Sequence, residues 1–382
     1  MKNIIRCFLS MGLAILISLA FPLHAVEEII PFDVNAKSAV LMDCNTGTVL
    51  YAKNADKALP PASVTKVMTL LLIMEAVDSG TISLDEEVVV SEYAASMGGS
   101  QVFLEVGELM SVEEMLKCVI ISSANDAAVA LAEKICGSES AFVSRMNERA
   151  GELGMHNTHF ENVTGLDDDT TNHLTSAYDI ALMSKELLKH TKILEYSSIW
   201  MDTIRDGAFG LTNTNRLIRF YNGATGLKTG STAKAGFCIS ATAEREGLHL
   251  IAVSMGSDSR DTRNAAAQTL LDWGFANYSI YKDTGGETGA ATVIRGTKNS
   301  CLGIQEPYAV LLPKGKQNQV SVEYLLFDKI SAPVHMGDVI GTARFYLDKQ
   351  ILSEIPIVSS EEIPEISFWE LLTRMFSIYL VK

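Results

Sequence analysis

The feature that most constrains the fold is a pair of prolines followed at once by a long apolar run. Pro60 and Pro61 precede Ala62-Ser63-Val64-Thr65-Lys66, and residues 67–74 are then almost entirely apolar. Proline disfavours a helix before it but is tolerated in the first helical turn. The sequence therefore predicts a helix that begins here, with Ser63 in its first turn.

Ser63 and Lys66 are three residues apart, which places both side chains on one helical face, one turn apart. The Lys66 amine should then reach the Ser63 hydroxyl, as a base reaches a nucleophile. Alternatively, Ser63 caps a free backbone N–H and Lys66 is a solvated charge. Two further pairs have the same spacing, at Ser231/Lys234 and Ser279/Lys282. Spacing alone does not separate the three pairs.

Composition narrows the class of protein. The chain has 382 residues, of which 47% are hydrophobic, and this is enough for two or three globular domains. Its formal net charge of -15 argues against nucleic acid or anionic lipid as a general electrostatic partner. Neither the cysteines nor the histidines have a metal-ligand spacing, so no metal or cofactor is expected. His156 and His159 are expected on the surface, and five scattered cysteines beyond residue 25 are expected as mostly buried thiols.

The N-terminus has the pattern of a secretory signal peptide over residues 1–25. Lys2 and Arg6 precede an apolar stretch, and Leu23-His24-Ala25 forms a small-residue cleavage region. The chain is therefore expected to be exported. An uncleaved membrane anchor is the alternative, because leucine is a poorer cleavage signal than alanine at this position.

Residues 26–280 read as one mixed domain. Strand-like runs at 38–43 and 48–53 flank a turn, strands return at 236–244 and 248–255, and a helix follows over 262–278. Between them, about residues 80–221 are dominated by helical patterns at 112–121, 127–135, 140–153 and 176–190. One sheet built from both ends of the domain, covered by helices and carrying a helical insertion, is the expected α/β (α+β) architecture.

Two further segments follow. After a glycine-rich linker at residues 284–289, residues 290–360 alternate short strand-like runs with turns and are expected to form a small all-β domain. Residues 366–382 then form an amphipathic helix with Ser367, Glu370, Thr373, Arg374 and Ser377 on one narrow face. A helix of this length spans only ~25 Å, so we expect it to lie in a membrane surface. Docking on the β domain or on a partner is the alternative.

Two more motifs strengthen the interpretation of Ser63 and Lys66 as a nucleophile and its base. Ser123-Ala124-Asn125 sits at a polar break between two apolar helices and offers a hydroxyl and a carboxamide. Lys228-Thr229-Gly230 precedes the later strand pair, with Lys234 expected in the strand that follows. Its glycine lets a substrate backbone approach the strand edge, and its ammonium supplies a fixed positive charge.

Ser-x-x-Lys, Ser-x-Asn and Lys-Thr-Gly in this order resemble the signature of the penicillin-binding proteins and serine β-lactamases. The residues in and around these motifs are most similar to those of the low-molecular-mass D-alanyl-D-alanine carboxypeptidases. Two further segments resemble the same family, Asn162-Val163-Thr164-Gly165-Leu166 and Leu271-Asp272-Trp273-Gly274-Phe275. The resemblance covers nearly the whole chain. It implies a β-lactamase/transpeptidase-like antiparallel sheet flanked by helices, peptidoglycan stem peptides as substrates and β-lactam antibiotics as inhibitors.

The resemblance also implies a role for each motif residue. Ser63 attacks the bond between the two terminal D-alanines and Lys66 acts as its base. Ser123 relays a proton to the leaving amine, and Asn125 holds substrate and Lys66. Lys228 and Thr229, beside Gly230 and with Arg263, bind the terminal carboxylate, while the backbone N–H groups of Ser63 and Ser231 form the oxyanion hole. Lys66 must be neutral to act, which partial burial and the nearby Lys228 charge would favour.

Two positions depart from the family pattern. Ser-Ala-Asn replaces the commoner Ser-Gly-Asn, and Thr214 stands where some relatives carry arginine, which leaves open which basic residues touch the stem peptide. Four rival functions remain: a serine β-lactamase, a transpeptidase, an endopeptidase that cuts cross-links, and a secreted penicillin-binding scaffold without activity. The extra β domain and terminal helix favour a wall enzyme on the outer face of the cytoplasmic membrane.

Overall fold

The structure is a computed structural model that describes residues 32–168 and 170–380. The chain divides into a unit at Met1–Asp33 and a second unit at Val34–Lys382. The expected signal peptide at residues 1–25 lies outside the described residues. The following paragraphs concern the second unit.

Five strands form an antiparallel sheet in the order β2-β1-β9-β8-β7. They are β1 (Ser38–Asp43), β2 (Val49–Lys53), β7 (Ala224–Thr232), β8 (Gly236–Arg245) and β9 (Leu248–Ser257). Val40 of β1 pairs with Val253 of β9, so the early hairpin joins strands from the other end of the domain. The prediction of one sheet built from both ends of the domain is confirmed. The sheet has one strand more than expected, because Lys228-Thr229-Gly230 lies inside edge strand β7.

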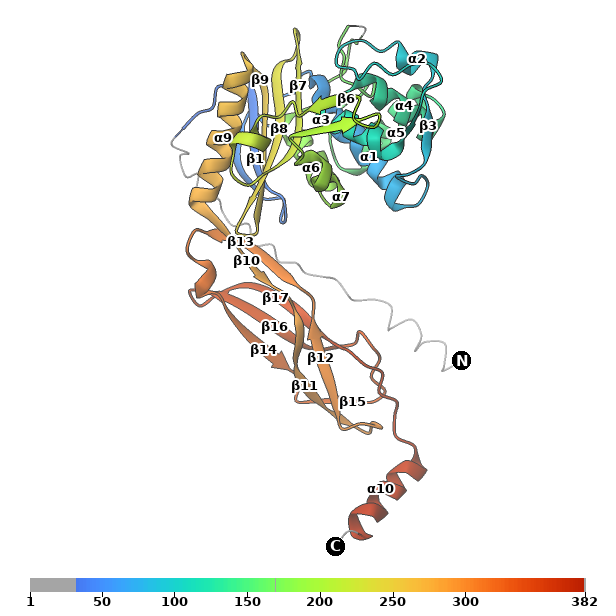
Figure 1. The fold of residues 1–382 in the computed structure, drawn as a ribbon. Coiled ribbons are helices and arrows are strands. Elements are labelled where there is room, and N and C mark those ends of the chain that lie inside the picture. Colours follow the sequence, from blue (N-terminus) through green and yellow to red (C-terminus); the bar gives the residue numbers. More distant parts are fainter. Residues whose placement is uncertain (1–31, 169, 381–382) are drawn as a thin grey trace, which may run out of the picture. The chain divides into compact units, whose positions relative to one another are not determined.

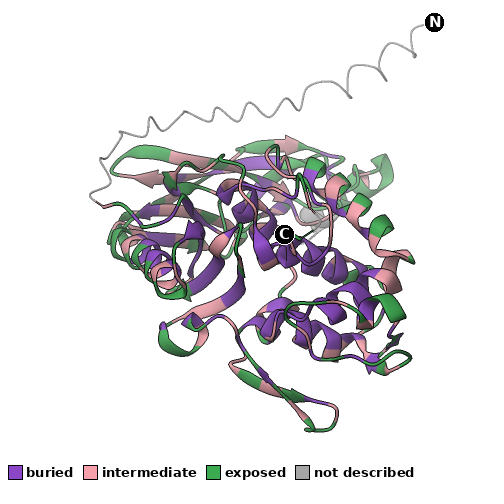
Figure 2. Cartoon of the chain, turned by 90° about the horizontal axis from the view of Figure 1, so that it is seen from above, coloured by how far each residue is buried: buried purple, intermediate pink, exposed green. Residues whose placement is uncertain are grey.

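Helices cover both faces of this sheet (Figure 1). Helix α9 (Arg260–Asn277) lies on one face, and Gly274 lets it approach closely, because a Cβ there would lie 2.5 Å from Leu250 Cδ1. Helix α1 (Lys66–Asp78) lies on the other side, and its residues from Lys66 to Met74 are all buried. A helix that is apolar on every side must be enclosed by other elements. Figure 2 shows buried residues concentrated in the sheet and the helices next to it.

The middle of the domain is mainly helical. Its helices are α2 (Glu92–Ala95), α3 (Val112–Ile121), α4 (Asn125–Cys136), α5 (Glu139–Glu152), α6 (Ala177–Leu187), α7 (Lys192–Ser197) and α8 (Leu217–Phe220). It also contains two small hairpins that the sequence did not predict: β3 (Glu87–Val89) with β4 (Leu109–Ser111), and β5 (Met201–Ile204) with β6 (Phe209–Thr212). In the first hairpin only Val88 and Met110 are buried, so its alternation is too short to stand out in a sequence.

The C-terminal part is an all-β domain. A six-stranded sheet has the order β14-β16-β17-β12-β11-β15, and β10 pairs with β13. The elements are β10 (Tyr278–Asp283), β11 (Gly286–Ile294), β12 (Ser300–Gln305), β13 (Tyr308–Pro313), η2 (Gln317–Gln319), β14 (Ser321–Leu326), β15 (Lys329–Ser331), β16 (Val339–Leu347) and β17 (Gln350–Ser359). Its own core includes Val293, Ile340 and Phe345.

Two sequence expectations need correction here. The glycine-rich stretch at residues 284–289 is not only a linker, because β11 begins at Gly286 and pairs with β12. The expected domain limit at residue 280 falls inside β10, which pairs with β13. The pairing of β10 with β13 joins residues 25 to 35 positions apart in sequence, such as Asp283 with Tyr308 and Tyr278 with Pro313, so local composition did not reveal it.

A final helix, α10 (Phe368–Leu380), follows the β domain. Phe368, Trp369, Leu371, Met375 and Phe376 are exposed on it. Among the described residues, no helix combines the length and the apolar character that crossing a bilayer requires.

Candidate active site

Ser63 lies on η1 (Ala62–Thr65), a short 3-10 turn that leads directly into α1. Ala62 has a φ of 50°, a left-handed conformation that a non-glycine residue adopts at a cost. The turn is held by the neighbouring loop, where Gly165 packs so closely that a Cβ there would lie 1.8 Å from the Ala62 carbonyl oxygen. The half-buried serine is therefore presented by a tightly supported turn.

Lys66 is fully buried beside this serine. Its Nζ lies 3.1 Å from Ser63 Oγ, 2.5 Å from Asn125 Oδ1 and 2.9 Å from the Thr164 carbonyl oxygen. Burial, and then the charge of Lys228, lower the pKa of the Lys66 amine well below its usual value, whereas Asp126 opposes the shift. A neutral amine is thus favoured, as the family resemblance requires.

The hydrogen bonds of Lys66 also orient the neutral amine. A neutral amine has two N–H groups and one lone pair. The Thr164 carbonyl can only accept, and Asn125 also presents an acceptor, because its Nδ2 donates to the Gly98 carbonyl at 2.6 Å. Both N–H groups are then used, and the lone pair is left for the hydroxyl proton of Ser63.

Ser123 and Asn125 come from the break between α3 and α4. Ser123 has a φ of 63°, which turns the chain sharply, and Asn125 is the first residue of α4. Asp126 follows and accepts hydrogen bonds from the backbone N–H groups of Val102 and Leu104, both at 3.1 Å. The buried carboxylate therefore holds the loop before β4 against the start of α4.

Lys228 is buried on edge strand β7. Its Nζ lies 2.8 Å from Ser123 Oγ and 2.9 Å from the Thr229 carbonyl oxygen. Burial, with a contribution from Arg263, lowers the pKa of Lys228 to about 7. Gly230 brings this strand against η1, because a Cβ there would lie 2.6 Å from the Ser63 backbone nitrogen. The three motifs therefore meet at one place.

A cleft of about 640 Å³ opens over this place. Its lining is Ser63, Ser100, Ser123, Trp200, Thr212, Asn213, Thr214, Arg216, Phe220, Thr229, Gly230, Ser231, Arg260 and Arg263. This volume suits a small-molecule or peptide ligand. Lys66, Asn125 and Lys228 do not line the cleft; they lie buried and contact residues that do. Thr229 Oγ1 donates to Thr214 Oγ1 at 2.8 Å, so the departure at Thr214 lies in the cleft wall.

The two other serine–lysine pairs are not built in this way. Ser279 and Lys282 lie on strand β10, and Ser231 lines the cleft from β7. Lys234 lies in the turn after β7 and not in a strand, which corrects the sequence expectation. The alternative that Lys66 is a solvated charge is wrong, because its side chain is buried.

Several site residues were missed by the sequence reasoning. The Thr164 carbonyl was not predicted as a partner of Lys66, although Asn162-Val163-Thr164-Gly165-Leu166 had been noticed as a motif. His173 was also missed. Its Nε2 lies 2.7 Å from Thr65 Oγ1, which donates to the Ala62 carbonyl, and its Nδ1 accepts from the Glu161 backbone N–H. Burial lowers the pKa of His173 to about 4, so a neutral imidazole supports η1.

Other expectations concern cysteines, histidines and metals. The cysteines in the described residues are free thiols, and three of the five are buried, in line with the expectation of mostly buried thiols: Cys118, Cys238 and Cys301 are buried, and Cys44 and Cys136 are partly buried. His156 and His159 are exposed, also as predicted. Within residues 32–168 and 170–380, no three His, Cys, Asp or Glu side chains group closely enough to hold a metal ion.

Known proteins are similar to this chain in both sequence and fold. Residues 24–259 match the family described as D-alanyl-D-alanine carboxypeptidase, and residues 275–365 match the C-terminal domain of penicillin-binding protein 5. The D-alanyl-D-alanine carboxypeptidase DacF of Bacillus subtilis is 45% identical over 348 residues, which cover 89% of this chain and 88% of that protein.

Two solved structures extend the comparison. Penicillin-binding protein 5 from Haemophilus influenzae is 32% identical with a TM-score of 0.73. The alignment covers 88% of this chain and 99% of the Haemophilus protein. Penicillin-binding protein D2 from Listeria monocytogenes, solved in its ampicillin-bound form, is 33% identical with a TM-score of 0.58. That alignment covers 63% of this chain and 98% of the Listeria protein.

Proposed function

The chain belongs to the D-alanyl-D-alanine carboxypeptidase family and is a serine-type hydrolase, and from this premise we propose that Ser63 is its nucleophile. The substrate is a peptidoglycan stem pentapeptide that ends in two D-alanines. The observation that carries the proposal is the position of the Lys66 amine, buried and 3.1 Å from Ser63 Oγ.

In the first half of the reaction, Ser63 Oγ attacks the carbonyl carbon between the two D-alanines. Its proton passes to the neutral Lys66 amine, whose lone pair faces it. The backbone N–H groups of Ser63 and Ser231 stabilise the oxyanion, each by about 3 kcal/mol. The close approach of Gly230 to the Ser63 backbone nitrogen supports this placement of strand and turn.

The leaving D-alanine needs a proton on its nitrogen and a partner for its carboxylate. Ser123 relays the proton, supported by its hydrogen bond with Lys228. Thr229, Lys228 and Arg263 hold the carboxylate, which is supported by the place of Thr229 and Arg263 in the cleft wall. Water then attacks the acyl-enzyme and releases Ser63 and the shortened peptide.

The same serine is proposed to react with β-lactams, whose ring carbonyl would give a stable acyl-enzyme. The ampicillin-bound form of the Listeria protein supports this extension. The test is intact-mass measurement after incubation with penicillin, together with D-alanine release from a pentapeptide. We expect one adduct on the wild-type chain and none on Ser63→Ala.

A matched control uses a serine outside the cleft. Ser279 also precedes a lysine by three residues, but it lies on β10, where its hydroxyl donates to Gln317. Ser279→Ala should therefore keep the adduct and the D-alanine release. An undiminished adduct on Ser63→Ala would remove the proposed nucleophile. Release of D-alanine only in the presence of an acceptor amine would favour a transpeptidase instead.

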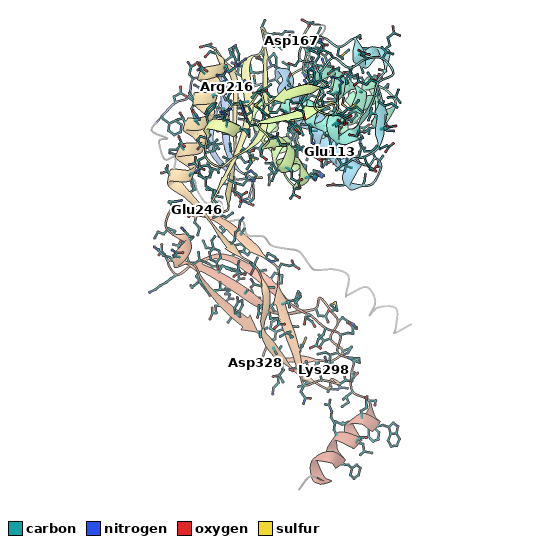
Figure 3. All side chains as sticks on the ribbon, in the orientation of Figure 1. Glu113, Asp167, Arg216, Glu246, Lys298 and Asp328 are labelled. Carbon is teal, nitrogen blue, oxygen red and sulfur yellow. The ribbon has the colours of Figure 1, made fainter. Side chains whose placement is uncertain are left out.

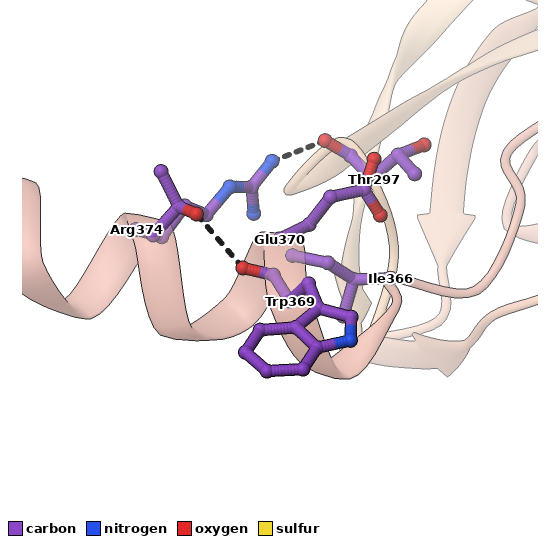
Figure 4. A pocket seen from close by; sticks show the side chains of 6 residues that line it. Thr297, Ile366, Trp369, Glu370 and Arg374 are labelled. Atoms are coloured by element: carbon purple, nitrogen blue, oxygen red, sulfur yellow. Dashed lines mark hydrogen bonds between the residues drawn. The ribbon is translucent and has the colours of Figure 1, made fainter.

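We place the enzyme outside the cytoplasm, where its peptidoglycan substrate lies. Export by a signal peptide at residues 1–25 and attachment to the outer face of the cytoplasmic membrane through α10 complete the proposal. Its support is the row of exposed apolar side chains on α10, including Trp369 at 73% exposure. Arg374 donates to the Thr297 carbonyl and Trp369 accepts from Thr373 (Figure 4), so the polar side of the helix contacts the β domain.

A further inference from the structure

Ten of the twelve arginines of this chain fall into two groups; Arg6 lies outside the described residues, and Arg374 on α10 donates to the Thr297 carbonyl. Six form ion pairs with nearby carboxylates: Arg145, Arg149, Arg205, Arg245, Arg295 and Arg344. Four others form no ion pair with any carboxylate in the described part of the chain: Arg216, Arg219, Arg260 and Arg263. Three of these four line the cleft that contains Ser63, and Arg219 is next to the lining residue Phe220. In a chain with a net charge of -15, several arginines without an ion-pair partner in one place are unexpected.

Helix α9 increases the positive potential around two of these arginines. Arg260 is the first residue of α9 and Arg263 lies in its first turn, at the positive end of the helix dipole. Arg216 directly precedes the short helix α8 and makes no side-chain capping hydrogen bond there; it is labelled in Figure 3. Burial, and then the charges of Arg260 and Arg216, lower the pKa of the Arg263 guanidinium to about 10. The Arg263 guanidinium therefore lies close enough to those of Arg260 and Arg216 to be repelled by both.

The fourth arginine, Arg219, contacts two aromatic side chains that line the same cleft. The Arg219 guanidinium lies 5.6 Å from the centres of both the Trp200 and Phe220 rings. These two rings contact each other edge to face at 6.3 Å. Both rings line the cleft, and cation–π contacts of this kind hold side chains in place. Arg216 thus lines the same cleft as this aromatic pair.

One substrate carboxylate does not balance this charge. In the proposed function, the terminal carboxylate contacts Thr229 and Arg263 in the cleft wall and is attracted by the charge of the buried Lys228 behind them. Arg216 and Arg260 are exposed, line the same cleft and have no carboxylate partner among the described residues. Guanidinium groups bind carboxylates with paired, charge-assisted hydrogen bonds. A second substrate carboxylate would therefore satisfy both.

We propose that Arg216 and Arg260 form a second anion subsite, which takes a free carboxylate on a stem-peptide residue other than the terminal D-alanine. This inference rests on the proposed function and specifies its substrate class: stem peptides with an unmodified dicarboxylic residue, in preference to those in which that carboxylate is amidated.

The experiment compares two pentapeptides that differ only at this carboxylate, one with the free acid and one with the primary amide. Charge-assisted hydrogen bonds predict that the wild-type kcat/KM favours the free acid by at least about tenfold at low salt. In Arg216→Gln/Arg260→Gln this ratio should fall to about one, with each single variant between the two values. Arg216→Lys should keep part of the ratio, because it keeps the charge.

Arg145→Gln is the matched control, because it removes one exposed arginine charge on α5 that pairs with Glu148. It should leave the ratio unchanged. A wild-type ratio near one, or an unchanged ratio in the double variant, overturns the inference. So does an equal loss for both peptides, which would mean that these arginines act only on the terminal carboxylate.

A binding measurement separates this inference from the proposed function. The dissociation constants of the two peptides are measured on Ser63→Ala, which binds without cleaving. If the wild-type chain released no D-alanine from either peptide, the proposed function would fail. The ratio of the two dissociation constants, and its loss in the triple variant with Arg216→Gln and Arg260→Gln, would still decide whether the second subsite exists.

Discussion

At the scale of single residues, two buried lysines carry opposite requirements. In the proposed mechanism, Lys66 must be neutral to accept a proton from Ser63, whereas Lys228 must be charged to attract a carboxylate. The structure lowers the pKa of both, and the charge of Lys228 is one cause of the shift at Lys66. Each lysine therefore depends on the protonation state of the other, and pH dependence should expose this link.

Replacing Lys228 tests the coupling between the protonation states of the two lysines. The rate of acylation by penicillin should rise with pH as Lys66 loses its proton, and fall again as Lys228, with a pKa of about 7, loses its charge. In Lys228→Met a neighbouring cation is gone, so the pKa of Lys66 rises and the acid limb moves to higher pH. Lys228→Arg stays charged, so its acid limb should remain in place and its alkaline limb should move upward.

The measurement is the second-order acylation rate constant between pH 5 and 10, in wild type and both variants. Both substitutions should lower the rate, because both disturb the carboxylate site. The position of the limbs, and not the height of the profile, decides the question. An acid limb at the same pH in wild type and Lys228→Met would contradict the coupling.

At the scale of elements, sequence reasoning succeeded where an element carries its own signal. The hairpin of β1 and β2 and the helix α3 were predicted nearly residue by residue, because apolar periodicity and turn residues are local. The helix predicted to begin around Ser63 was placed correctly, but Ser63 lies on the 3-10 turn η1 and α1 begins at Lys66. Strand β7 was not recognised as a full strand of the sheet. Its character comes from pairing with β8 and from contact with η1, and neither is visible in a short window of sequence.

The candidate site divides in the same way. Ser63, Ser123 and Lys228 were found because each begins a short motif, and their order was informative. The Thr164 carbonyl, His173, Arg216 and Arg260 were not found, since a backbone carbonyl or a lone side chain carries no motif. Their contributions exist only after loops from different parts of the chain have packed around η1 and the cleft.

Gly165 offers a test of how the loop at residues 162–166 supports η1. Its φ is 81°, and a Cβ there would lie 1.8 Å from the Ala62 carbonyl oxygen and 2.8 Å from Thr65 Oγ1. Gly165→Ala must displace η1, because the contact is with backbone. We expect a loss of unfolding free energy of at least about 3 kcal/mol, from strain and overpacking together, and acylation by penicillin at least about tenfold slower.

Gly80→Ala is the matched control for this substitution. Gly80 has a similar φ of 73°, but a Cβ there would meet nothing within 4 Å. It should therefore lose only about 1 kcal/mol from backbone strain, with an unchanged acylation rate. Urea unfolding and acylation rates measure both quantities. Equal effects of the two substitutions would show that the contact with Ala62 does not hold the nucleophile in place.

At the scale of the whole molecule, the chain combines a reaction site with a segment that suits a lipid surface. The cleft and its arginines lie in the residues before β10, whereas α10 carries exposed apolar side chains and only Glu370 and Arg374 as charged residues among those described. With few charges on the helix, apolar burial should dominate its binding to a bilayer. Binding should therefore depend little on salt or on anionic lipid.

Single charges placed on the two sides of α10 test this. Phe376 is 59% exposed, and burying such a side chain in lipid contributes about 2 kcal/mol, equal to roughly thirtyfold in binding. Phe376→Glu should therefore weaken binding to uncharged phosphatidylcholine vesicles at least thirtyfold. Thr373→Glu adds the same charge on the polar side, where Thr373 lines the pocket beside Arg374, and should change binding far less.

Vesicle flotation measures the binding of both variants, and deletion of residues 366–382 sets the baseline. If the two substitutions weaken binding equally, the apolar face is not what enters the membrane; if the deleted chain still floats with the vesicles, the contact lies elsewhere in the chain.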